Sequence, residues 1–200
     1  MAIAVEADVK SVLLEFEEAI LDAMYGAWHD WLASPHRAQI RFRRTRANLV
    51  HDFMVHRAVT AFDGNPDVHV VYQDETAKFL FKRKVLVRLK KGDSNHLGSN
   101  IETQAVLAFT DPQLTIPGLP DVQKVDIVYV LNDLQTEIDR VVVTARNNDV
   151  RLWSYDIEDR RVAPVLPLVQ PIAPADGGNV VRLRTRANPK ANSRDNDKNG

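Results

Sequence analysis

One stretch limits the possible folds of this chain more than any other: "KFLFKRKVLVRLK", residues 78–90. Apolar and basic side chains alternate along it, which is the pattern of a β-strand with one buried face. An unbroken strand of this length would span about 40 Å at about 3.3 Å per residue, so we expect a bulge near Lys82–Lys84. Together with "VHVVYQ" before it, the stretch predicts a β-hairpin that turns near Gln73–Ala77.

The residues before this hairpin have helical spacing. Apolar side chains recur at steps of three and four from Asp8 to Ser34, which predicts one long helix with two adjacent apolar stripes that ends at Pro35. The favoured interpretation is a core helix; a homo-oligomer or protein partner bound through residues 8–34 is the alternative. A second helix is predicted from Thr45, whose hydroxyl is expected to cap it, to Phe62.

The second half of the chain predicts one helix followed by strands. "SNIE" at Ser99–Glu102 has the pattern of a capping box and predicts a helix that ends at Thr110. Three further strands are expected, the last two joined by a tight turn at "NND": Val125–Leu131, Val141–Arg146 and Val150–Ile157. This order predicts an α+β fold with a mostly antiparallel sheet of about five strands, a long N-terminal helix and two further helices.

Composition indicates one globular domain, residues 1–161, with 44% hydrophobic and 26% charged residues in the whole chain. Residues 162–200 are rich in Pro and Gly and then basic and polar, which predicts a flexible, disordered tail. There is no signal-peptide pattern and no apolar run of about 18 residues, so we expect a cytoplasmic protein that makes no membrane contact. The 17 arginines against 9 lysines are typical of a GC-rich bacterial genome.

Several catalytic classes lack their motifs. The absence of cysteine excludes disulfides, thiolate metal sites and cysteine nucleophiles. There is no G-x-S-x-G elbow, no phosphate-binding P-loop and no G-x-G-x-x-G sequence. His51 and His56 are five residues apart on the predicted helix, so their side chains diverge. We therefore predict no cofactor and no metal site, and an interaction protein rather than an enzyme.

One enzyme class remains as an alternative. The order helix, hairpin, helix, strand loosely resembles that of metal-dependent nucleases of the PD-(D/E)XK type. The resemblance implies Asp74 as the first acid, Lys84 or Lys90 as the lysine, and Glu17 or Glu18 on the first helix. The acid-x-Lys position reads Arg88-Leu89-Lys90, without the second carboxylate that Mg²⁺ would require. A degenerate nuclease-like fold that binds without cutting is included in this alternative.

Basic residues give the strongest functional signal. Residues 34–93 contain thirteen bases and six acids, net +7, whereas residues 1–33 have a net charge of −6. The bases form one group before the second helix and another on one side of the predicted strand: Arg37, Arg41, Arg43, Arg44 and Arg46; Lys78, Lys82, Lys84, Arg88 and Lys90. If solvated, the strand group would form a row of cations about 7 Å apart, close to the spacing of phosphates along one nucleic-acid strand.

This pattern predicts a surface that binds the nucleic-acid backbone without sequence specificity, or an acidic protein partner. The strand group has no interleaved aromatic residues. Accessory components of bacterial regulatory, toxin–antitoxin or phage-defence systems are examples of such proteins. Two structural interpretations compete with it: lysines that protect an edge strand from aggregation, and pairing with the acidic first helix.

The pentapeptide "RTRAN" occurs twice, at Arg44–Asn48 and Arg184–Asn188. The first copy enters the predicted second helix. The second is followed by Pro189, which disfavours helical geometry at Asn188. The two copies therefore do not encode one repeated fold unit. We expect Arg184 and Arg186 to belong to an exposed basic arm that supplements the domain's own basic surface, with chance identity as the alternative.

Overall fold

The fold was analysed in a computed structural model, which describes residues 3–73, 76–98, 104–111, 114, 118 and 121–158. All of them belong to one compact unit, Met1–Val162. The tail predicted at residues 162–200 and the capping box predicted at Ser99–Glu102 lie outside the described residues. None of the described helices is long and apolar enough to cross a membrane.

The N-terminal segment forms two helices instead of the single one predicted. Helix α1 (Glu6–Leu13) and helix α2 (Glu17–Ala33) are separated by a turn at residues 14–16. The Phe16 ring lies 4.9 Å from the Phe81 ring and 6.1 Å from the Phe62 ring, centroid to centroid. The prediction of one straight helix was wrong because tertiary packing at Phe16 outweighs the continuous helical pattern.

A short 3₁₀ turn, η1 (Arg37–Gln39), leads to helix α3 (Arg43–Phe62). The end of this helix was predicted correctly, but its beginning was not. Phe42 is the N-cap residue, with no side-chain capping bond, and Thr45 lies within the first turn. The Thr45 cap was therefore wrong, and three arginines occupy the first turn of α3.

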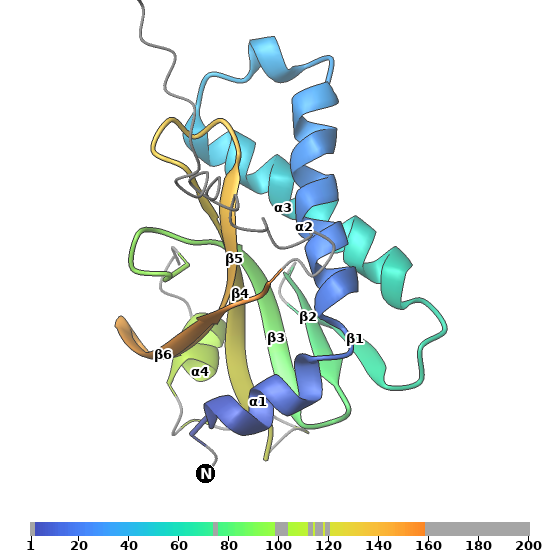
Figure 1. The fold of residues 1–200 in the computed structure, drawn as a ribbon, viewed down its shortest axis with the longest axis vertical. Coiled ribbons are helices and arrows are strands. Elements are labelled where there is room, and N and C mark those ends of the chain that lie inside the picture. Colours follow the sequence, from blue (N-terminus) through green and yellow to red (C-terminus); the bar gives the residue numbers. More distant parts are fainter. Residues whose placement is uncertain are drawn as a thin grey trace, which may run out of the picture. The chain divides into compact units, whose positions relative to one another are not determined.

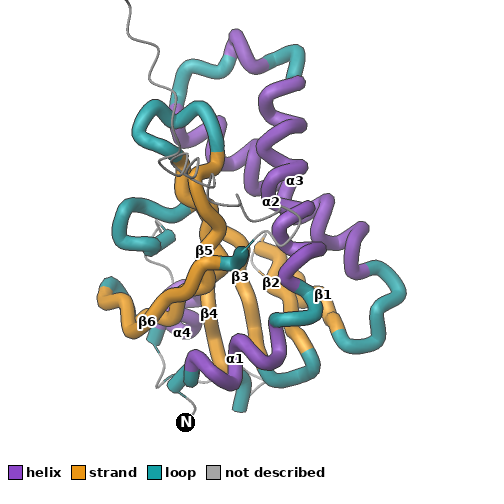
Figure 2. Tube along the Cα trace, in the orientation of Figure 1, coloured by secondary structure: helices purple, strands orange, loops and turns teal. Residues whose placement is uncertain are grey.

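Six strands form one mixed sheet in the order β1-β2-β3-β4-β5-β6 (Figures 1 and 2). The α+β class and the mostly antiparallel sheet are confirmed, with six strands rather than about five. Helix α4 (Gln104–Thr110) lies between β3 and β4 in the chain, and these two strands are parallel. The strands are β1 (Val68–Gln73), β2 (Thr76–Phe81), β3 (Val85–Lys91), β4 (Gln123–Leu131), β5 (Ile138–Asn147) and β6 (Val150–Asp156).

The sixth strand arises at Lys82–Lys84, where a turn stands in place of the predicted bulge. Lys82 and Arg83 adopt left-handed backbone angles, with φ of 45° and 54°. The Lys84 amide donates to the Phe81 carbonyl at 2.9 Å. The chain thus reverses, and β2 and β3 pair antiparallel. Because β3 also pairs with β4, it is an interior strand, and the prediction of an edge strand protected by lysines was wrong.

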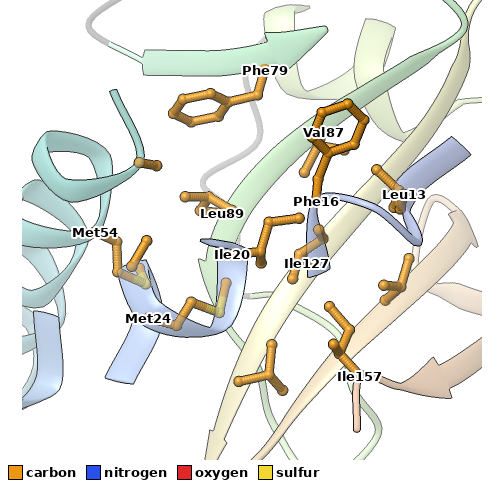
Figure 3. Packing of buried hydrophobic residues seen from close by; sticks show 14 of the residues in the cluster. Leu13, Phe16, Ile20, Met24, Met54, Phe79, Val87, Leu89, Ile127 and Ile157 are labelled. Atoms are coloured by element: carbon orange, nitrogen blue, oxygen red, sulfur yellow. The ribbon is translucent and has the colours of Figure 1, made fainter. Parts of the chain in front are cut away.

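One face of the sheet packs against α1, α2 and α3 and forms the main core (Figure 3). Phe79, Val87 and Ile127 reach into this core from three strands, and Ile20 and Met54 meet them from α2 and α3. The main apolar stripe of residues 8–34 is buried inside the chain, as expected of core helices. Assembly through these helices stays a prediction.

Candidate nucleic-acid interface

The opposite face of the sheet contains a layer of polar and charged side chains. Val87 and Leu89 point into the main core, so the alternating Arg88 and Lys90 belong to this other face. The strand register aligns a row across the sheet, in which Arg88 lies beside Asp126, Asp126 beside Thr144 and Thr144 beside Ser154. The alternation in the sequence correctly predicted that Arg88 and Lys90 share one side of β3. It did not predict that other residues cover this side.

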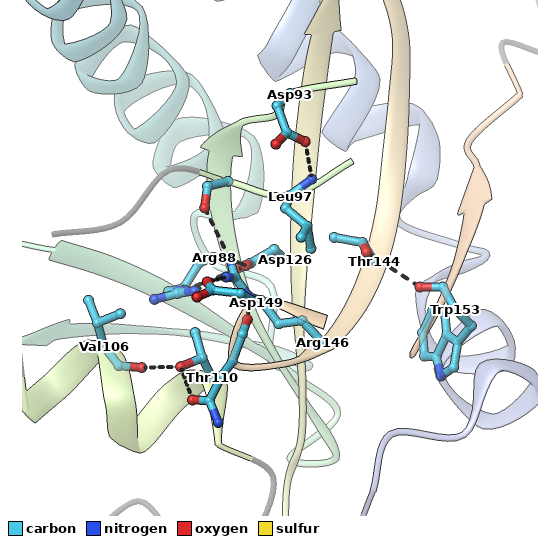
Figure 4. A network of polar contacts seen from close by, with 12 residues as sticks. Arg88, Asp93, Leu97, Val106, Thr110, Asp126, Thr144, Arg146, Asp149 and Trp153 are labelled. Atoms are coloured by element: carbon cyan, nitrogen blue, oxygen red, sulfur yellow. Dashed lines mark hydrogen bonds and ion pairs between the residues drawn. The ribbon is translucent and has the colours of Figure 1, made fainter. Parts of the chain in front are cut away.

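A buried network joins Arg88, Asp126 and Arg146 (Figure 4). Arg88 donates two hydrogen bonds to Asp126, at 2.8 and 3.0 Å, and Arg146 lies 3.8 Å from the same carboxylate. Asp126 is 0% exposed and Arg88 3%. The Arg88 guanidinium also lies 3.8 Å from the centre of the Phe109 ring on α4. Arg146 also forms an ion pair with Asp149 at 3.1 Å, so two carboxylates face the two guanidinium groups, and buried charges are stable only when they are paired in this way.

The loop at residues 92–98 covers part of this face. Arg146 donates to the Gly98 carbonyl at 3.0 Å, and His96 Nδ1 lies 3.2 Å from Ser154 Oγ. Arg151 also approaches His96 Nδ1, and because a guanidinium only donates, this ring nitrogen accepts. A Cβ added to Gly98 would lie 2.9 Å from Cβ of Lys90, so only glycine fits at this approach. The loop is thereby fastened to β5 and β6.

The predicted exposed row of strand cations does not exist as one surface. Lys78 and Arg88 are buried, while Lys82 and Lys84 lie in the turn before β3. Lys82 forms an ion pair with Glu15, which follows α1. This pair supports, for Lys82, the alternative of pairing with the acidic N-terminal segment. Lys84 is exposed, and Lys90 is half-buried.

A different set of cations meets at the carboxyl end of β3. We define the α3–β3 cluster as Arg43 and Arg46, from the first turn of α3, with Lys91, the last residue of β3. Burial lowers the pKa of Lys91, and the nearby positive charges of Arg46 and Arg43 lower it further. Arginines close enough to lower the pKa of a lysine form a region of positive potential together with it.

Arg46 is held in place by two contacts. Its guanidinium donates to Gln135 Oε1 in the β4–β5 loop at 2.5 Å and lies 5.9 Å from the Trp28 ring centre. Trp28 in turn donates to the Thr136 carbonyl of the same loop at 3.2 Å. The cluster on α3 and β3 is therefore supported by Trp28 of α2 and by the β4–β5 loop.

The exposed arginines around this cluster have no acidic partner among the residues that the structure describes. Arg41, Arg43 and Arg44 are exposed, and no described carboxylate forms an ion pair with any of them. The same holds for Lys91 within the described ranges. Of the four arginines predicted here, Arg46 alone has a described side-chain hydrogen bond. This surface thus presents positive charge that the described fold does not neutralise.

Two half-buried groups flank the cluster on β3 and α3. Burial lowers the pKa of Lys90, and Arg88 adds to this effect. Burial also lowers the pKa of His51 on α3, with a further contribution from the positive charge of Lys90. An anion placed beside these groups would favour their charged forms. The sequence excluded His51 as a metal ligand because it diverges from His56 on the helix. Its proximity to Lys90 could not be predicted, because it depends on how α3 packs on β3.

Phe42 and Lys91 were also missed by sequence reasoning. The Phe42 side chain is 75% exposed and lies between Arg41 and Arg43 in the sequence. Lys91 ends the apolar side of β3, directly after Lys90. Both residues stand beside basic residues in the sequence, in "RFRR" and "LKK". The exposure of Phe42 could not be predicted, because it depends on the exact residue at which α3 begins.

Three predicted residues cannot be placed, since Asp74, Arg184 and Arg186 lie outside the described residues. Among the side chains that the structure describes, no three His, Asp or Glu groups converge to hold a metal ion. Asp126 is a carboxylate beside β3, but two guanidinium groups surround it. Among the described residues, no further carboxylate is therefore available as a metal ligand for the nuclease alternative.

Fold and surface together define an α+β protein with a basic cluster, at the carboxyl end of an interior strand, that no described carboxylate neutralises. No protein-family model, no curated protein and no solved structure matches the chain.

Proposed function

We propose that this protein binds the phosphate backbone of nucleic acid through the α3–β3 cluster and the exposed Arg41 and Arg44 beside it. The observation that supports this proposal most is the proximity of Arg43, Arg46 and Lys91: burial lowers the pKa of Lys91, and the charges of Arg46 and Arg43 lower it further. Concentrated like charge costs folding free energy unless a counter-charge is bound. A polyanion supplies that counter-charge, and guanidinium groups bind phosphate in bidentate geometry.

The geometry favours contacts to the backbone over contacts to base edges. The cations lie on a helix start and a strand end, not along one face of a helix that could enter a groove and contact base edges. Phosphate contacts position a protein on nucleic acid without selecting a sequence. The proposed activity is therefore non-catalytic binding with weak sequence preference and strong dependence on salt.

Fluorescence anisotropy with labelled oligonucleotides at two salt concentrations tests the proposal. Wild-type affinity is expected to fall steeply with salt, and Arg43→Glu/Arg44→Glu is expected to weaken binding at least about tenfold at low salt. Lys84→Glu is the matched control, because Lys84 lies at the other end of β3, about 23 Å from Lys91 at about 3.3 Å per residue. A loss as large for Lys84→Glu as for the double variant would contradict this location.

Poly-L-glutamate provides a second arm of the same titration. Weak competition by poly-L-glutamate at equal charge concentration is the result expected of a phosphate-binding surface. Equal competition would favour the acidic protein partner instead. Absence of all binding at low salt would refute a polyanion site.

A further inference from the structure

The aromatic ring at the start of α3 leads to a narrower ligand class, and this inference rests on the proposed function. Phe42 is 75% exposed, although a phenylalanine side chain normally gains free energy by burial. Its backbone is fixed, since the Phe42 carbonyl accepts from the Arg46 amide at 3.2 Å and begins the helix. The ring is therefore presented from an ordered position and not from a loose loop.

The ring lies within the basic surface. Exposed arginines flank it in the sequence on both sides, at Arg41 and Arg43. Arg43, which directly follows Phe42, belongs to the α3–β3 cluster, and its positive charge adds to the effect of burial in lowering the pKa of Lys91. Phe42 is therefore adjacent to the cluster. An exposed aromatic ring surrounded by cations is the combination that proteins use to bind single strands, in which bases stack on rings while phosphates meet cations.

A duplex offers its phosphates to such a surface but keeps its base faces stacked inside. Only unpaired bases can lie flat against an exposed ring, so the ring favours single-stranded over double-stranded nucleic acid. We propose that Phe42 is a stacking platform for an unpaired base, and that the ligand of the basic surface is single-stranded nucleic acid.

The neighbouring loop extends the apolar part of this surface. Leu134 in the β4–β5 loop is 82% exposed, and the adjacent Gln135 is bonded to Arg46. An apolar side chain at this position can pack against the next base or sugar of a bound strand. The carboxylate of Asp133 is exposed in the same loop and is expected to limit how closely a phosphate approaches there.

Four variants and three probes test the inference in the full-length protein. The probes are a 15-nucleotide oligo(dT), an abasic oligonucleotide of the same length and a DNA hairpin duplex. Phe42→Leu keeps an apolar side chain but removes the ring, and Phe42→Trp enlarges the ring. Tyr72→Leu is the control, because Tyr72 is 67% exposed on the edge strand β1 and lies outside the basic surface. Arg43→Glu tests the cations.

Wild type is expected to bind oligo(dT) more tightly than the abasic probe and the duplex. Phe42→Leu is expected to weaken oligo(dT) binding by about 5- to 100-fold, the range of one base–aromatic stack, and to leave the abasic affinity unchanged. Tyr72→Leu should change neither affinity. The added fluorescence of Phe42→Trp, measured against wild type, is expected to be quenched by oligo(dT) and not by the abasic probe.

Equal affinity of wild type for oligo(dT) and the abasic probe would overturn the stacking platform. So would a loss with Phe42→Leu that is the same for all three probes, since the ring would then only position the arginines. In both cases a strong effect of Arg43→Glu would leave the proposed function intact. If no probe binds wild type at low salt, the proposed function itself fails.

Discussion

Two groups of cations lie on either side of the end of β3, and they differ in what neutralises them. In the buried network, Arg88 and Arg146 share the fully buried Asp126, and Arg146 also forms an ion pair with Asp149. In the α3–β3 cluster, Arg43 and Lys91 approach one another without a described carboxylate between them. The charges of the first group are paired within the fold, whereas the second group leaves positive charges close together, which costs stability. Basic residues in one short sequence region thus have opposite roles.

The largest expected effect tests the buried side of this comparison. Asp126→Asn leaves the buried Arg88 without its counter-charge, while Arg146 keeps its ion pair with Asp149. The free energy of unfolding should fall by about 3–5 kcal/mol. Urea unfolding followed by circular dichroism measures it. Arg43→Met, which alters an exposed arginine, is the matched comparison and should stay within about 0.5 kcal/mol of wild type. Similar losses in both variants would remove the distinction between the two groups.

The second prediction concerns binding affinity instead of stability, and here the α3–β3 cluster is expected to show the larger effect. Arg43→Met/Lys91→Met removes two cations from the cluster and should reduce the affinity for oligo(dT) about 10- to 100-fold. The slope of log affinity against log salt should fall by about 1.4, because each lost phosphate contact contributes about 0.7 on single strands. Asp126→Asn, titrated at a temperature where it is folded, should retain wild-type affinity. A large affinity loss in Asp126→Asn would link the two groups.

The third prediction concerns the loop that covers the buried network. Gly98→Ala would place a methyl group 2.9 Å from Lys90 Cβ, so the loop must shift and weaken the Arg146 bond to its carbonyl. A loss of about 1–3 kcal/mol in the free energy of unfolding is expected from such overpacking. Gly26→Ala is the control, since the nearest atoms to its methyl group belong to the half-exposed guanidinium of Arg57, which is paired with Asp30. The cost of shifting this exposed pair should be offset by the higher helix propensity of alanine, so the variant should be nearly neutral.

The smallest effect concerns the charge of Lys91. Burial, Arg46 and Arg43 hold its folded-state pKa below the ordinary 10.5, so the unfolded chain binds more protons between the two values. The resulting penalty is present at neutral pH and disappears as pH rises through the folded pKa towards 10.5. Lys91→Met should therefore exceed wild-type stability at pH 7.5, by no more than about 0.5 kcal/mol after solvent screening.

Urea unfolding at pH 7.5 and pH 10 measures this difference, which should shrink at the higher pH. Lys84→Met removes one positive charge from the exposed turn before β3 and controls for the change in net charge. A stability difference for Lys91→Met that is the same at both pH values would show that its charge is not the cause.

Local pattern predicted the main elements of the sheet because period-two alternation and turn residues act over a few neighbours. The hairpin at β1 and β2, the turn at residues 147–149 and the end of α4 at Thr110 follow from this. The turn at Lys82 and Arg83 was missed because two non-glycine residues with positive φ give no sequence signal. Because of this turn, the predicted row of cations is divided: Lys82 and Lys84 lie in the turn, and Arg88 lies on the buried strand β3.

The sequence by itself determined the α+β class, the alternation of β3 and the concentration of arginines before α3, since these depend on composition and local spacing. Only the tertiary structure decided which of those charges are neutralised. Asp126 is 38 residues from Arg88 and Lys91 is 45 residues from Arg46, so their proximity depends on the β3–β4 register and on the packing of α3. Electrostatic energy depends on distance and burial in space, which separation along a chain does not encode.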